Sequence, residues 1–596
     1  MTLNIIGISA HFHDAACCLL RDGALVCAAE EERFSRAKHD PGLPWNAFRL
    51  CLEQGGLTLG DIDTIAYYEN PTKKLARQIW MVLHGAGAES RRGKFLGRLP
   101  EYVGRVEREI RQGLGYAGRL EVFDHHLSHA ASSFFFSGFD EAAILTVDGV
   151  GEWATTTLGR AAGADIELFE EVQFPHSLGL FYSAITAYLG FEVNDGEYKV
   201  MGLAPYGEPL YVDQVRQLIT PATPAGNGQY RLAMEYFDFM RQDRMFSDRL
   251  AELFGAPPRT PEAELLPFHH HVARSAQYVL EEILLEKVRY LADKVPSRNL
   301  CMAGGVALNC VANGRILREG PFDRMFVQPA ASDAGGCLGA AALAHVRRSG
   351  ERPAQGRLTH MRWGPAAAAE QVAALLAATG LPSQDYRGRT EELLEATVDR
   401  LAAGKVVGWF SGRMEFGPRA LGSRSILADP RDPGMRDRIN ALVKMREGFR
   451  PFAPAVLERH SAEHFALDHP SPFMLETCQV VSPLALPAIT HVDGSARVQT
   501  VDAESNPRFA GLLERFARRT GCPVLLNTSF NLRGEPIVCT PEDALLCFTR
   551  SRIDSLVLDD FLLDRESIPP TWHELTARLL AGQPVGLVSH EMYTLF

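Results

Sequence analysis

The chain has 596 residues, of which 46% are hydrophobic and 22% are charged, and its formal net charge is −12. This length exceeds what one hydrophobic core supports, so we expect about two to four domains of an ordinary globular protein. The acidic balance argues against a surface that coats nucleic acid. The N-terminus lacks a basic stretch, no apolar run approaches the ~18 residues of a membrane-spanning helix, and the 11 cysteines form no CxxC pair. We therefore expect a cytoplasmic protein with reduced thiols, no signal peptide and no membrane segment.

The first elements that the sequence predicts are three β-strands. Residues 3–8 (LNIIGI) form one strand, and residues 15–34 hold two more that are joined at Asp22-Gly23, a dipeptide typical of hairpin turns. The polar turn at 9–14 contains His13 and can bring backbone amides close to a phosphate. Nucleotide-binding folds of the actin and sugar-kinase type begin in this way, although many other sheets do so too.

Two charged stretches follow the predicted hairpin. Residues 30–39 (EEERFSRAKH) mix both charge signs, and we interpret most of them as a solvated strand end or helix start. Lys38 and His39 at its end are better placed to reach an anionic substrate. Residues 72–120 are the most basic stretch, with flanks that look helical. We interpret it as an inserted helical region rather than a nucleic-acid site, because the whole chain is acidic.

The next stretch has the spacing of a metal site. His125 and His129 are four residues apart, so on a helix they share one face, about 5–6 Å apart at Cβ, and can bind one cation. Residues 142–147 (AAILTV) predict a buried strand that places Asp148 at its C-terminal end, where a carboxylate can act as a third ligand. The alternative is a solvated helix face, which we expect for His126, and an aspartate that only caps a strand.

A second hairpin is predicted around this aspartate. Residues 154–160 (ATTTLGR) are again strand-like, so Asp148-Gly149 begins a turn between two strands. We interpret this turn as an echo of the hairpin at Asp22-Gly23. Two copies of a strand, an acidic turn and a strand indicate a duplicated nucleotide-binding core.

The middle of the chain combines predicted helices with irregular segments. A helix is expected at 177–191, followed at 195–207 by a glycine-punctuated loop in which Lys199 is a candidate phosphate or substrate contact. Residues 208–265 are polar and irregular and are interpreted as a second insertion. The histidine triplet at 269–271 leads a helix, and consecutive histidines on a helix cannot all face one ion.

Two strand-to-helix turns complete the predicted core. Residues 299–317 place Gly304-Gly305 at such a turn, where backbone amides can approach a phosphate or an adenosine. Residues 325–346 repeat the pattern with Asp333 before the helix. We expect Asp333 to join His125, His129 and Asp148 in one cleft. Two histidines and two aspartates suit Fe(II), Mn(II) or Zn(II).

A Gly-, Pro- and Arg-rich segment at 347–366 reads as a linker to a second domain. In that domain, residues 404–433 predict a strand, a glycine turn and a basic loop, and residues 441–456 bring further basic side chains among aromatic residues and prolines. Such side chains can form a pocket for a small dianion. Residues 522–545 predict a strand that ends in short hydrogen-bonding side chains, where open α/β sheets bind ligands.

The segments together resemble the carbamoyltransferase family of nodulation-factor, cephem and aminoglycoside O-carbamoyltransferases. They follow one another in the family's order and cover nearly the whole chain. The matching segments are HFHDAACCLLRDG, EEERFSRAKH, HHLSHA, LTVDGVGEW, EYKVMGLAPYG, AGGVALN, PAASDAGGCLGAA, MEFGPRALGSRSILADPR, FRPFAPAV and LLNTSFNLRGEPIVCTPEDA.

The resemblance implies an α/β protein with two folds. The N-terminal fold is a duplicated domain of the actin-like and sugar-kinase superfamily, like the universal tRNA threonylcarbamoyl-transfer protein, and the C-terminal fold is a YrdC-like α/β domain. The expected boundaries are 1–350 for the first domain, 351–366 for the linker, 367–565 for the second domain and 566–596 for a short helical tail.

The resemblance also implies an activity. The C-terminal domain would use carbamoyl phosphate and ATP with Mg²⁺ to make carbamoyl adenylate, and the N-terminal domain would transfer the carbamoyl group at an iron site to a hydroxyl of a natural product or sugar. The partners would be a small-molecule acceptor and, in a homodimer, a second copy, with no nucleic acid or membrane. The alternatives are a threonylcarbamoyl-transfer enzyme of tRNA modification and a regulatory homologue without catalysis.

The residue roles that the resemblance implies fall into four groups. The metal ligands are His125, His129, Asp148 and Asp333, and the catalytic candidates are His13, which would activate the acceptor, and Lys38. The nucleotide-binding residues of the first domain are Gly149, Lys199, Gly304, Gly305 and Asn309. The carbamoyl phosphate and ATP site of the second domain comprises Arg419, Arg424, Lys444, Arg446, Arg450, Asn527, Ser529 and Asn531.

Overall fold

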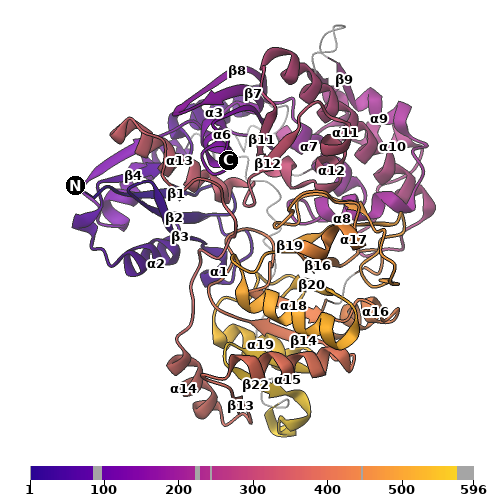
Figure 1. The fold of residues 1–596 in the computed structure, drawn as a ribbon. Coiled ribbons are helices and arrows are strands. Elements are labelled where there is room, and N and C mark those ends of the chain that lie inside the picture. The colour runs from indigo at the N-terminus through magenta and orange to yellow at the C-terminus, as the bar shows by residue number, and fades with distance from the viewer. Residues whose placement is uncertain (1, 85–96, 222–228, 242–243, 445–446, 573–596) are drawn as a thin grey trace. The chain divides into compact units, whose positions relative to one another are not determined.

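The structure is a computed structural model that describes residues 2–84, 97–221, 229–241, 244–444 and 447–572. Within the described chain two compact units are distinct. The N-terminal unit holds the residues up to Glu31 together with His39–Leu358, and the C-terminal unit holds Glu32–Lys38 and the residues from Thr359 onward. Each unit is an α/β structure, as the sequence predicts (Figure 1).

The first sheet of the N-terminal unit has the strand order β3-β2-β1-β4-β5. The strands β1, β2 and β3 pair antiparallel, whereas β4 and β5 run parallel to β1. The predicted hairpin is confirmed, because Asp22 and Gly23 both have positive φ angles, 50° and 77°, and join β2 to β3 in a two-residue turn. The strands are β1 (Asn4–Ser9), β2 (Ala16–Arg21), β3 (Ala24–Glu30), β4 (Thr64–Tyr67) and β5 (Arg119–Val122).

The second sheet repeats this topology, which confirms the predicted duplication. Its order is β12-β11-β6-β7-β8, in which β6, β7 and β8 pair antiparallel and β11 and β12 run parallel to β6. Thus β6 takes the place of β1, and β11 and β12 take the places of β4 and β5. The strands are β6 (Glu141–Val147), β7 (Ala154–Ala162), β8 (Asp165–Gln173), β11 (Asn299–Ala303) and β12 (Arg324–Val327).

One detail of the predicted duplication is wrong. The connection between β6 and β7, which begins at Asp148, is equivalent to the connection between β1 and β2, which contains His13. The equivalent of the Asp22-Gly23 turn is instead the turn at Gly163 between β7 and β8. The connections that hold His13 and Asp148 therefore occupy corresponding positions in the two halves.

The helices α6 and α13 pack closely in the interior of the N-terminal unit. A Cβ atom added to Gly339 of α13 would lie 1.8 Å from the carbonyl oxygen of Ser128 on α6, and one added to Gly7 of β1 would lie 1.9 Å from the carbonyl oxygen of Cys337. Glycine at these positions allows backbone to approach backbone. The longer helices of the unit are α2 (Trp45–Gly55), α3 (Pro71–His84), α6 (His125–Phe134), α7 (Leu178–Tyr188), α11 (Pro267–Lys294), α12 (Cys310–Glu319) and α13 (Asp333–Ser349).

The inserted regions are more regular than the sequence suggests. Lys199 lies on a helix, α8 (Glu197–Leu203), rather than in a loop, because the buried side chains of this segment pack onto the unit. The region 208–265 contains α9 (Val212–Leu218), α10 (Asp248–Phe254) and a hairpin of β9 (Ile219–Pro221) and β10 (Tyr230–Leu232). In the basic region, α3 and the short α5 (Arg105–Arg108) confirm the expected helices, and residues 85–96 lie outside the described chain.

The C-terminal unit is built on one mixed sheet of eight strands, with α14 (Ala369–Thr379), α15 (Thr390–Ala402), α18 (Pro507–Thr520) and α19 (Pro541–Arg550) as its longer helices. The expected basic loop is partly wrong, because Arg424 begins a buried strand that pairs with both β14 and β20. In sheet order the strands are β13 (Gln384–Asp385), β22 (Phe561–Asp564), β21 (Ser555–Leu558), β14 (Val407–Phe410), β15 (Arg424–Ala428), β20 (Val524–Ser529), β16 (Ala453–Leu457) and β19 (Gln499–Val501).

A short helix from the N-terminal part of the sequence belongs to this C-terminal unit. It is α1 (Glu32–Ser35), and Arg33 donates a hydrogen bond of 2.8 Å to the carbonyl oxygen of Gly417. Arg36 donates to the carbonyl oxygens of Pro536 and Ile537 at 2.8 and 2.7 Å. The segment EEERFSRAKH therefore begins a helix, one of the two forms expected, but Glu32 and Arg33 are buried rather than solvated, and the two arginines hold residues 32–38 on the C-terminal unit.

Three further expectations can be compared with the described residues. The segment 351–366, which we expected to be a linker, contains no helix or strand. All 11 cysteines are buried and unbridged, as expected for small core residues. No helix within the described ranges is both long and apolar enough to cross a membrane. Most of the expected tail, from 573 to 596, lies outside those ranges.

Candidate metal centre and active site

The structure brings the four predicted metal ligands of the N-terminal unit together. The Nε2 atoms of His125 and His129 lie 3.0 Å apart, and Nε2 of His125 lies 3.2 Å from Oδ2 of Asp148. Oδ1 of Asp333 lies 3.7 Å from both Nε2 atoms. The four donor atoms all lie within 4.8 Å of one another, and all four side chains are buried. We call these four residues the metal cluster.

Local structure explains why these four side chains meet. His125 and His129 lie one turn apart on α6, Asp148 directly follows β6, and Asp333 is the first residue of α13. Because β6 and β11 are parallel neighbours, their carboxyl ends meet at the same edge of the sheet. The cluster therefore lies where the ends of strands and the beginnings of helices converge.

Gly304 and Gly305, whose predicted nucleotide binding stays a prediction, help to position Asp148. The backbone N–H of Gly305 donates a hydrogen bond of 2.7 Å to Oδ1 of Asp148. Gly304 has a φ of 95°, and a Cβ atom there would lie 2.3 Å from the carbonyl oxygen of Val147. Glycine at 304 thus lets the end of β11 approach the end of β6, and the next amide orients the carboxylate.

The donor set fits a divalent metal ion. The hydroxyl of Tyr68 donates to Oδ2 of Asp333 at 2.9 Å, so each carboxylate has one oxygen held by the protein and the other facing the histidines. Oδ1 of Asp333 is buried and has no hydrogen-bond partner within the described residues. A buried carboxylate oxygen without a partner is costly, and a cation relieves that cost. Two imidazoles and two carboxylates are a common donor set for Fe(II), Mn(II) and Zn(II).

The electrostatics of the metal cluster favour a protonated His125 and ionised aspartates. Burial lowers the pKa of His125, but the charges of Asp333 and Asp148 and the hydrogen bond to Asp148 raise it to about 9. Burial raises the pKa of Asp148, yet the two histidines hold it well below its ordinary value. The carboxylates are therefore ionised at neutral pH, and a metal ion would compete with protons for the imidazole nitrogens.

We expected His126, which lies between the two ligands, to be solvated, and this expectation is wrong. It is buried, its Nδ1 is 2.6 Å from Oγ1 of Thr146, and its Nε2 is 2.9 Å from the carbonyl oxygen of Ala154. Burial and the neighbouring histidines lower the pKa of His126 well below its ordinary value. It is therefore a neutral structural side chain with both nitrogens in use.

The catalytic candidate His13 lies in the connection between β1 and β2. Its Nδ1 is 3.2 Å from Oδ2 of Asp14, whose Oδ1 is 2.6 Å from Nδ1 of His39. Burial lowers the pKa of His13, but the carboxylates of Asp333 and Asp14 outweigh it and raise that pKa to about 10. His13 is thus coupled electrostatically to the metal cluster. The other candidate, Lys38, belongs to the segment that packs with the C-terminal unit, and its catalytic role stays a prediction.

The other residues of the predicted nucleotide site, Gly149, Asn309 and Lys199, each make different contacts. A Cβ atom at Gly149 would meet no atom within 4 Å, so this backbone faces open space. Asn309 caps α12 by accepting from the amide of Ala312, and its side-chain amide also pairs with Gln277. Nζ of Lys199 lies 5.6 Å from the ring centre of Phe191. Nucleotide binding by these residues stays a prediction.

In the C-terminal unit, strand pairing brings part of the predicted anion site together. β15 and β20 are antiparallel neighbours, with Ser425 opposite Ser529, so Arg424 and Ser529 lie on adjacent strands. The hydroxyl of Ser529 donates to Oδ1 of Asn531 at 2.7 Å. Nδ2 of Asn527 donates to Oε1 of Gln499 at 2.8 Å.

The arginines of this predicted site differ in exposure. Arg424 is fully buried, its guanidinium lies 3.5 Å from the ring centre of Phe410, and burial lowers its pKa. Arg419 and Arg450 are half-buried, and Arg450 lies 3.9 Å from Glu447. Arg446 and the side chain of Lys444 lie outside the described residues.

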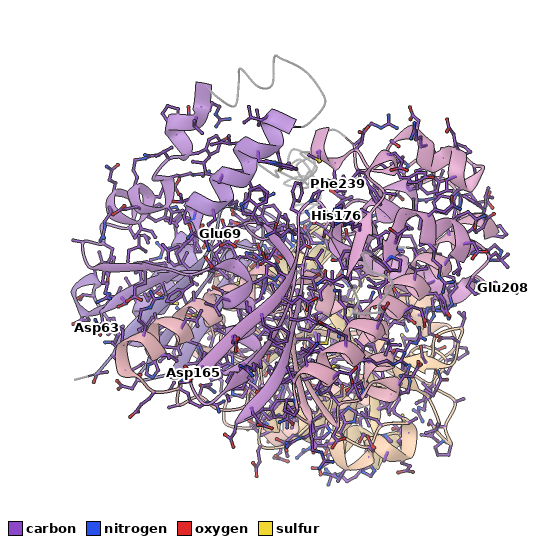
Figure 2. The ribbon with its side chains drawn as sticks, turned by 90° about the horizontal axis from the view of Figure 1, so that it is seen from above. Asp63, Glu69, Asp165, His176, Glu208 and Phe239 are labelled. Carbon is purple, nitrogen blue, oxygen red and sulfur yellow. The ribbon has the colours of Figure 1, made fainter. Side chains whose placement is uncertain are left out.

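Sequence reasoning missed the residues that orient the cluster. Tyr68 follows β4 and Glu152 follows the turn after β6. Oε1 of Glu152 accepts from the amide of His125 at 2.9 Å and from the amide of Asn70 at 2.6 Å. Glu69, labelled in Figure 2, lies in the same junction between β4 and α3 and accepts from Lys74 at 2.6 Å. The junction between β4 and α3 directly follows a buried strand, at the edge of a parallel sheet where ligands bind. This position is the sequence signal that could have pointed to Tyr68 and Glu69.

Comparison with known proteins assigns the family. The model of the carbamoyltransferase N-terminus matches residues 4–342, and that of the carbamoyltransferase C-terminus matches residues 398–565. An uncharacterized protein of Synechocystis sp., sll1178, is 44% identical over 603 residues, which cover 95% of this chain and 97% of that protein. The nodulation protein NolNO of Sinorhizobium fredii is 38% identical over 95% of this chain and 81% of its own length, and nodulation protein U of Rhizobium tropici is 29% identical over 93% and 95%. The chain, with both of its units matched, belongs to the carbamoyltransferase family of enzymes.

Proposed function

We propose that this enzyme is an ATP-dependent O-carbamoyltransferase that forms carbamoyl adenylate in its C-terminal unit and transfers the carbamoyl group in its N-terminal unit. The observation that carries the proposal is the convergence of His125, His129, Asp148 and Asp333 in one buried cluster. The cluster lies in a chain whose two halves both match the carbamoyltransferase family.

The first half-reaction would activate the carbamoyl group. Carbamoyl phosphate and water give carbamate and phosphate, and the carbamate oxygen then attacks the α-phosphorus of ATP, releasing pyrophosphate. The C-terminal basic side chains would neutralise these anions, and amide and hydroxyl groups would bind the carbamoyl amide, which offers two donors and one acceptor. The residues proposed for this work are Arg419, Arg424, Lys444, Arg446, Arg450, Asn527, Ser529 and Asn531.

The second half-reaction would form the carbamate ester. The acceptor hydroxyl gives its proton to Nε2 of His13, its oxygen bonds to the carbamoyl carbon, and the bond from that carbon to the adenylate oxygen breaks so that AMP leaves. A divalent ion held by the metal cluster would act as a Lewis acid toward a carbonyl or phosphate oxygen and would offset the carboxylate charges that raise the pKa of His13. Iron is the metal that we propose first, with manganese or zinc as alternatives.

The proposed acceptor is a small molecule with a free hydroxyl, such as a natural product or a sugar. Because nodulation proteins are among the relatives, a nodulation factor is one acceptor to test. A tRNA acceptor is disfavoured by the net charge of −12, which would repel a polyanion.

The test is to incubate the purified protein with carbamoyl phosphate, ATP and Mg²⁺ and to measure pyrophosphate. We expect pyrophosphate that depends on carbamoyl phosphate, followed by AMP when hydroxylamine is added as a small nucleophile. A protein that releases neither product contradicts the proposal and favours a regulatory homologue. If pyrophosphate forms only when L-threonine and bicarbonate replace carbamoyl phosphate, the result would favour a threonylcarbamoyl-transfer enzyme.

A further inference from the structure

The connection between β1 and β2 is held against residues 39–42 by backbone hydrogen bonds. The amide of His11 donates to the carbonyl oxygen of Pro41 at 2.7 Å, and the amide of Ala15 donates to that of Asp40 at 3.0 Å. His11, Asp14 and His39 all have positive φ angles, 71°, 55° and 56°. Left-handed backbone is unfavourable at a residue other than glycine, and such residues cluster at active sites and ligand-binding sites. The fold thus holds two strained segments side by side.

Asp14 bridges two histidines across these segments. Its Oδ2 lies 3.2 Å from Nδ1 of His13, and its Oδ1 lies 2.6 Å from Nδ1 of His39. The positive charges of His39 and His13 outweigh burial and hold the pKa of Asp14 well below its ordinary value. Asp14 is therefore an ionised carboxylate, which can only accept hydrogen bonds. Both Nδ1 atoms must then carry their protons.

This arrangement determines which nitrogen of His13 can react. With its Nδ1 proton bound to Asp14, a neutral His13 has its lone pair on Nε2. No hydrogen bond to Nε2 of His13 is formed within the described residues, and 20% of the side chain is exposed. His39 holds the second oxygen of Asp14, so the carboxylate cannot rotate away from His13 without breaking a 2.6 Å contact.

We propose that Asp14 and His39 are positioning residues that fix the orientation and the tautomer of His13, so that its Nε2 can accept the proton of the acceptor hydroxyl. The inference rests on the proposed O-carbamoyl transfer. It goes further in assigning the work of holding His13 to a His–Asp–His chain, in which Asp14 is adjacent to His13 and His39 comes from the neighbouring segment 39–42. Neither positioning residue would contact the substrate.

The test reads the tautomer directly. Enzyme labelled with ¹⁵N in its histidine rings is examined by NMR above the pH at which His13 loses its second proton, and the His13 signals are assigned by their loss in His13→Gln. We expect a proton on Nδ1 in the wild type. Asp14→Ala and His39→Leu should lose this Nδ1–H signal in favour of Nε2–H, whereas His39→Asn, which keeps a donor for Asp14, should retain it.

Asp40→Ala is the matched control, because Asp40 lies in the same loop and its side chain accepts, among the described residues, from the amide of Gly42 rather than from either histidine. It should leave the His13 signals unchanged. A wild-type proton on Nε2, or an unchanged tautomer in Asp14→Ala or His39→Leu, overturns the inference. Hydroxylamine, whose nitrogen needs no base, gives a separate readout of the proposed function: the wild type and Asp40→Ala should form hydroxyurea and AMP. Loss of these products in the wild type would reject the proposed function, while the tautomer result would still decide the geometry.

Discussion

Tyr68 shows how one side chain can set the geometry of a metal cluster. It is fully buried, burial raises the pKa of its hydroxyl well above the ordinary value, and the hydroxyl therefore keeps its proton and donates to Asp333. This leaves Oδ1 of Asp333 directed toward His125 and His129. A partner of this kind orients a ligand without touching the metal.

We predict that Tyr68→Phe weakens metal binding about 10–100-fold, because Oδ2 of Asp333 loses its donor. The measurement is the metal content of the purified protein and its loss to a competing chelator. Tyr67→Phe is the matched control, since Tyr67 donates to the carbonyl oxygen of Ala10 and not to a ligand. Equal metal affinities in Tyr68→Phe and the wild type would contradict the prediction.

A second residue-scale prediction concerns His469 of the C-terminal unit. Its Nε2 is 3.0 Å from both oxygens of Glu476 and its Nδ1 is 2.9 Å from Asp468, and these carboxylates raise its pKa to about 9. Because the folded-state pKa is raised, the ion pairs of His469 stabilise the folded protein fully below its unfolded-state pKa of about 6.5. This stabilisation is lost as the pH rises through about 9.

His469→Gln should therefore lower the Tm at pH 6 and leave it nearly unchanged at pH 10. Because the side chain is 39% exposed, solvent screening keeps the effect small, and we expect a shift of roughly 1–3 °C. The measurement is calorimetry of both proteins at the two pH values. A difference in Tm that is the same at both pH values would show that the ion pair is not its source.

At the scale of elements, the packing of α13 on α6 holds the cluster together. Asp333 begins α13, and both histidines lie on α6. The two helices approach so closely at Gly339 that only a residue without a Cβ atom fits against Ser128. Any spreading of the helices would move Asp333 away from His129.

We predict that Gly339→Ala destabilises the N-terminal unit by about 1–3 kcal/mol or more, because the new methyl group overlaps backbone atoms that cannot move independently. It should lower both the Tm and the metal affinity. Gly511→Ala on α18 is the control, since its Cβ atom would meet its nearest neighbours at 3.3 Å, and alanine should favour that helix by up to ~1 kcal/mol. Similar Tm values for the two variants would contradict the packing argument.

Element by element, the sequence was a good guide where local signals agreed with packing. The Asp22-Gly23 hairpin and the strand before Asp148 were predicted because turn chemistry and hydrophobic patterning are local. The helix that carries Lys199 was missed, because nearby glycines favour a loop and only the burial of Val200, Met201 and Leu203 makes the helix favourable. The strand that begins at Arg424 was missed for the same reason.

At the scale of the whole molecule, the proposed function divides the reaction between the two units. Removing a metal ligand should affect only the transfer step, and removing a phosphate-binding arginine should affect only activation. We predict that His125→Ala or His129→Ala abolishes carbamoyl transfer but spares pyrophosphate release. Arg419→Gln should slow pyrophosphate release roughly 10–100-fold, the usual effect of losing a charged hydrogen bond.

Pyrophosphate release and hydroxyurea formation, measured separately, distinguish the two steps. His270→Ala and Arg436→Gln serve as controls, because both residues lie outside the proposed sites, His270 in the first turn of α11 and Arg436 in an exposed pair with Asp437. If the histidine variants kept full transfer with metal still bound, the ligand assignment would be wrong.

The sequence by itself determined the family, seven of the ten strands in the two N-terminal sheets (all but β4, β5 and β8), the shared helix face of His125 and His129, and the position of Asp148 at the end of a strand. These features follow from order and local spacing. The sequence also predicted that Asp333 would join this cluster, and the structure brings the four side chains together. Only the tertiary structure decided that Tyr68 and Gly305 orient the carboxylates of the cluster, that Gly304 allows the close approach of two strands, and that Asp14 joins His13 to His39. Such contacts join residues far apart in the chain, and they depend on strand pairing and helix packing, which no local pattern encodes.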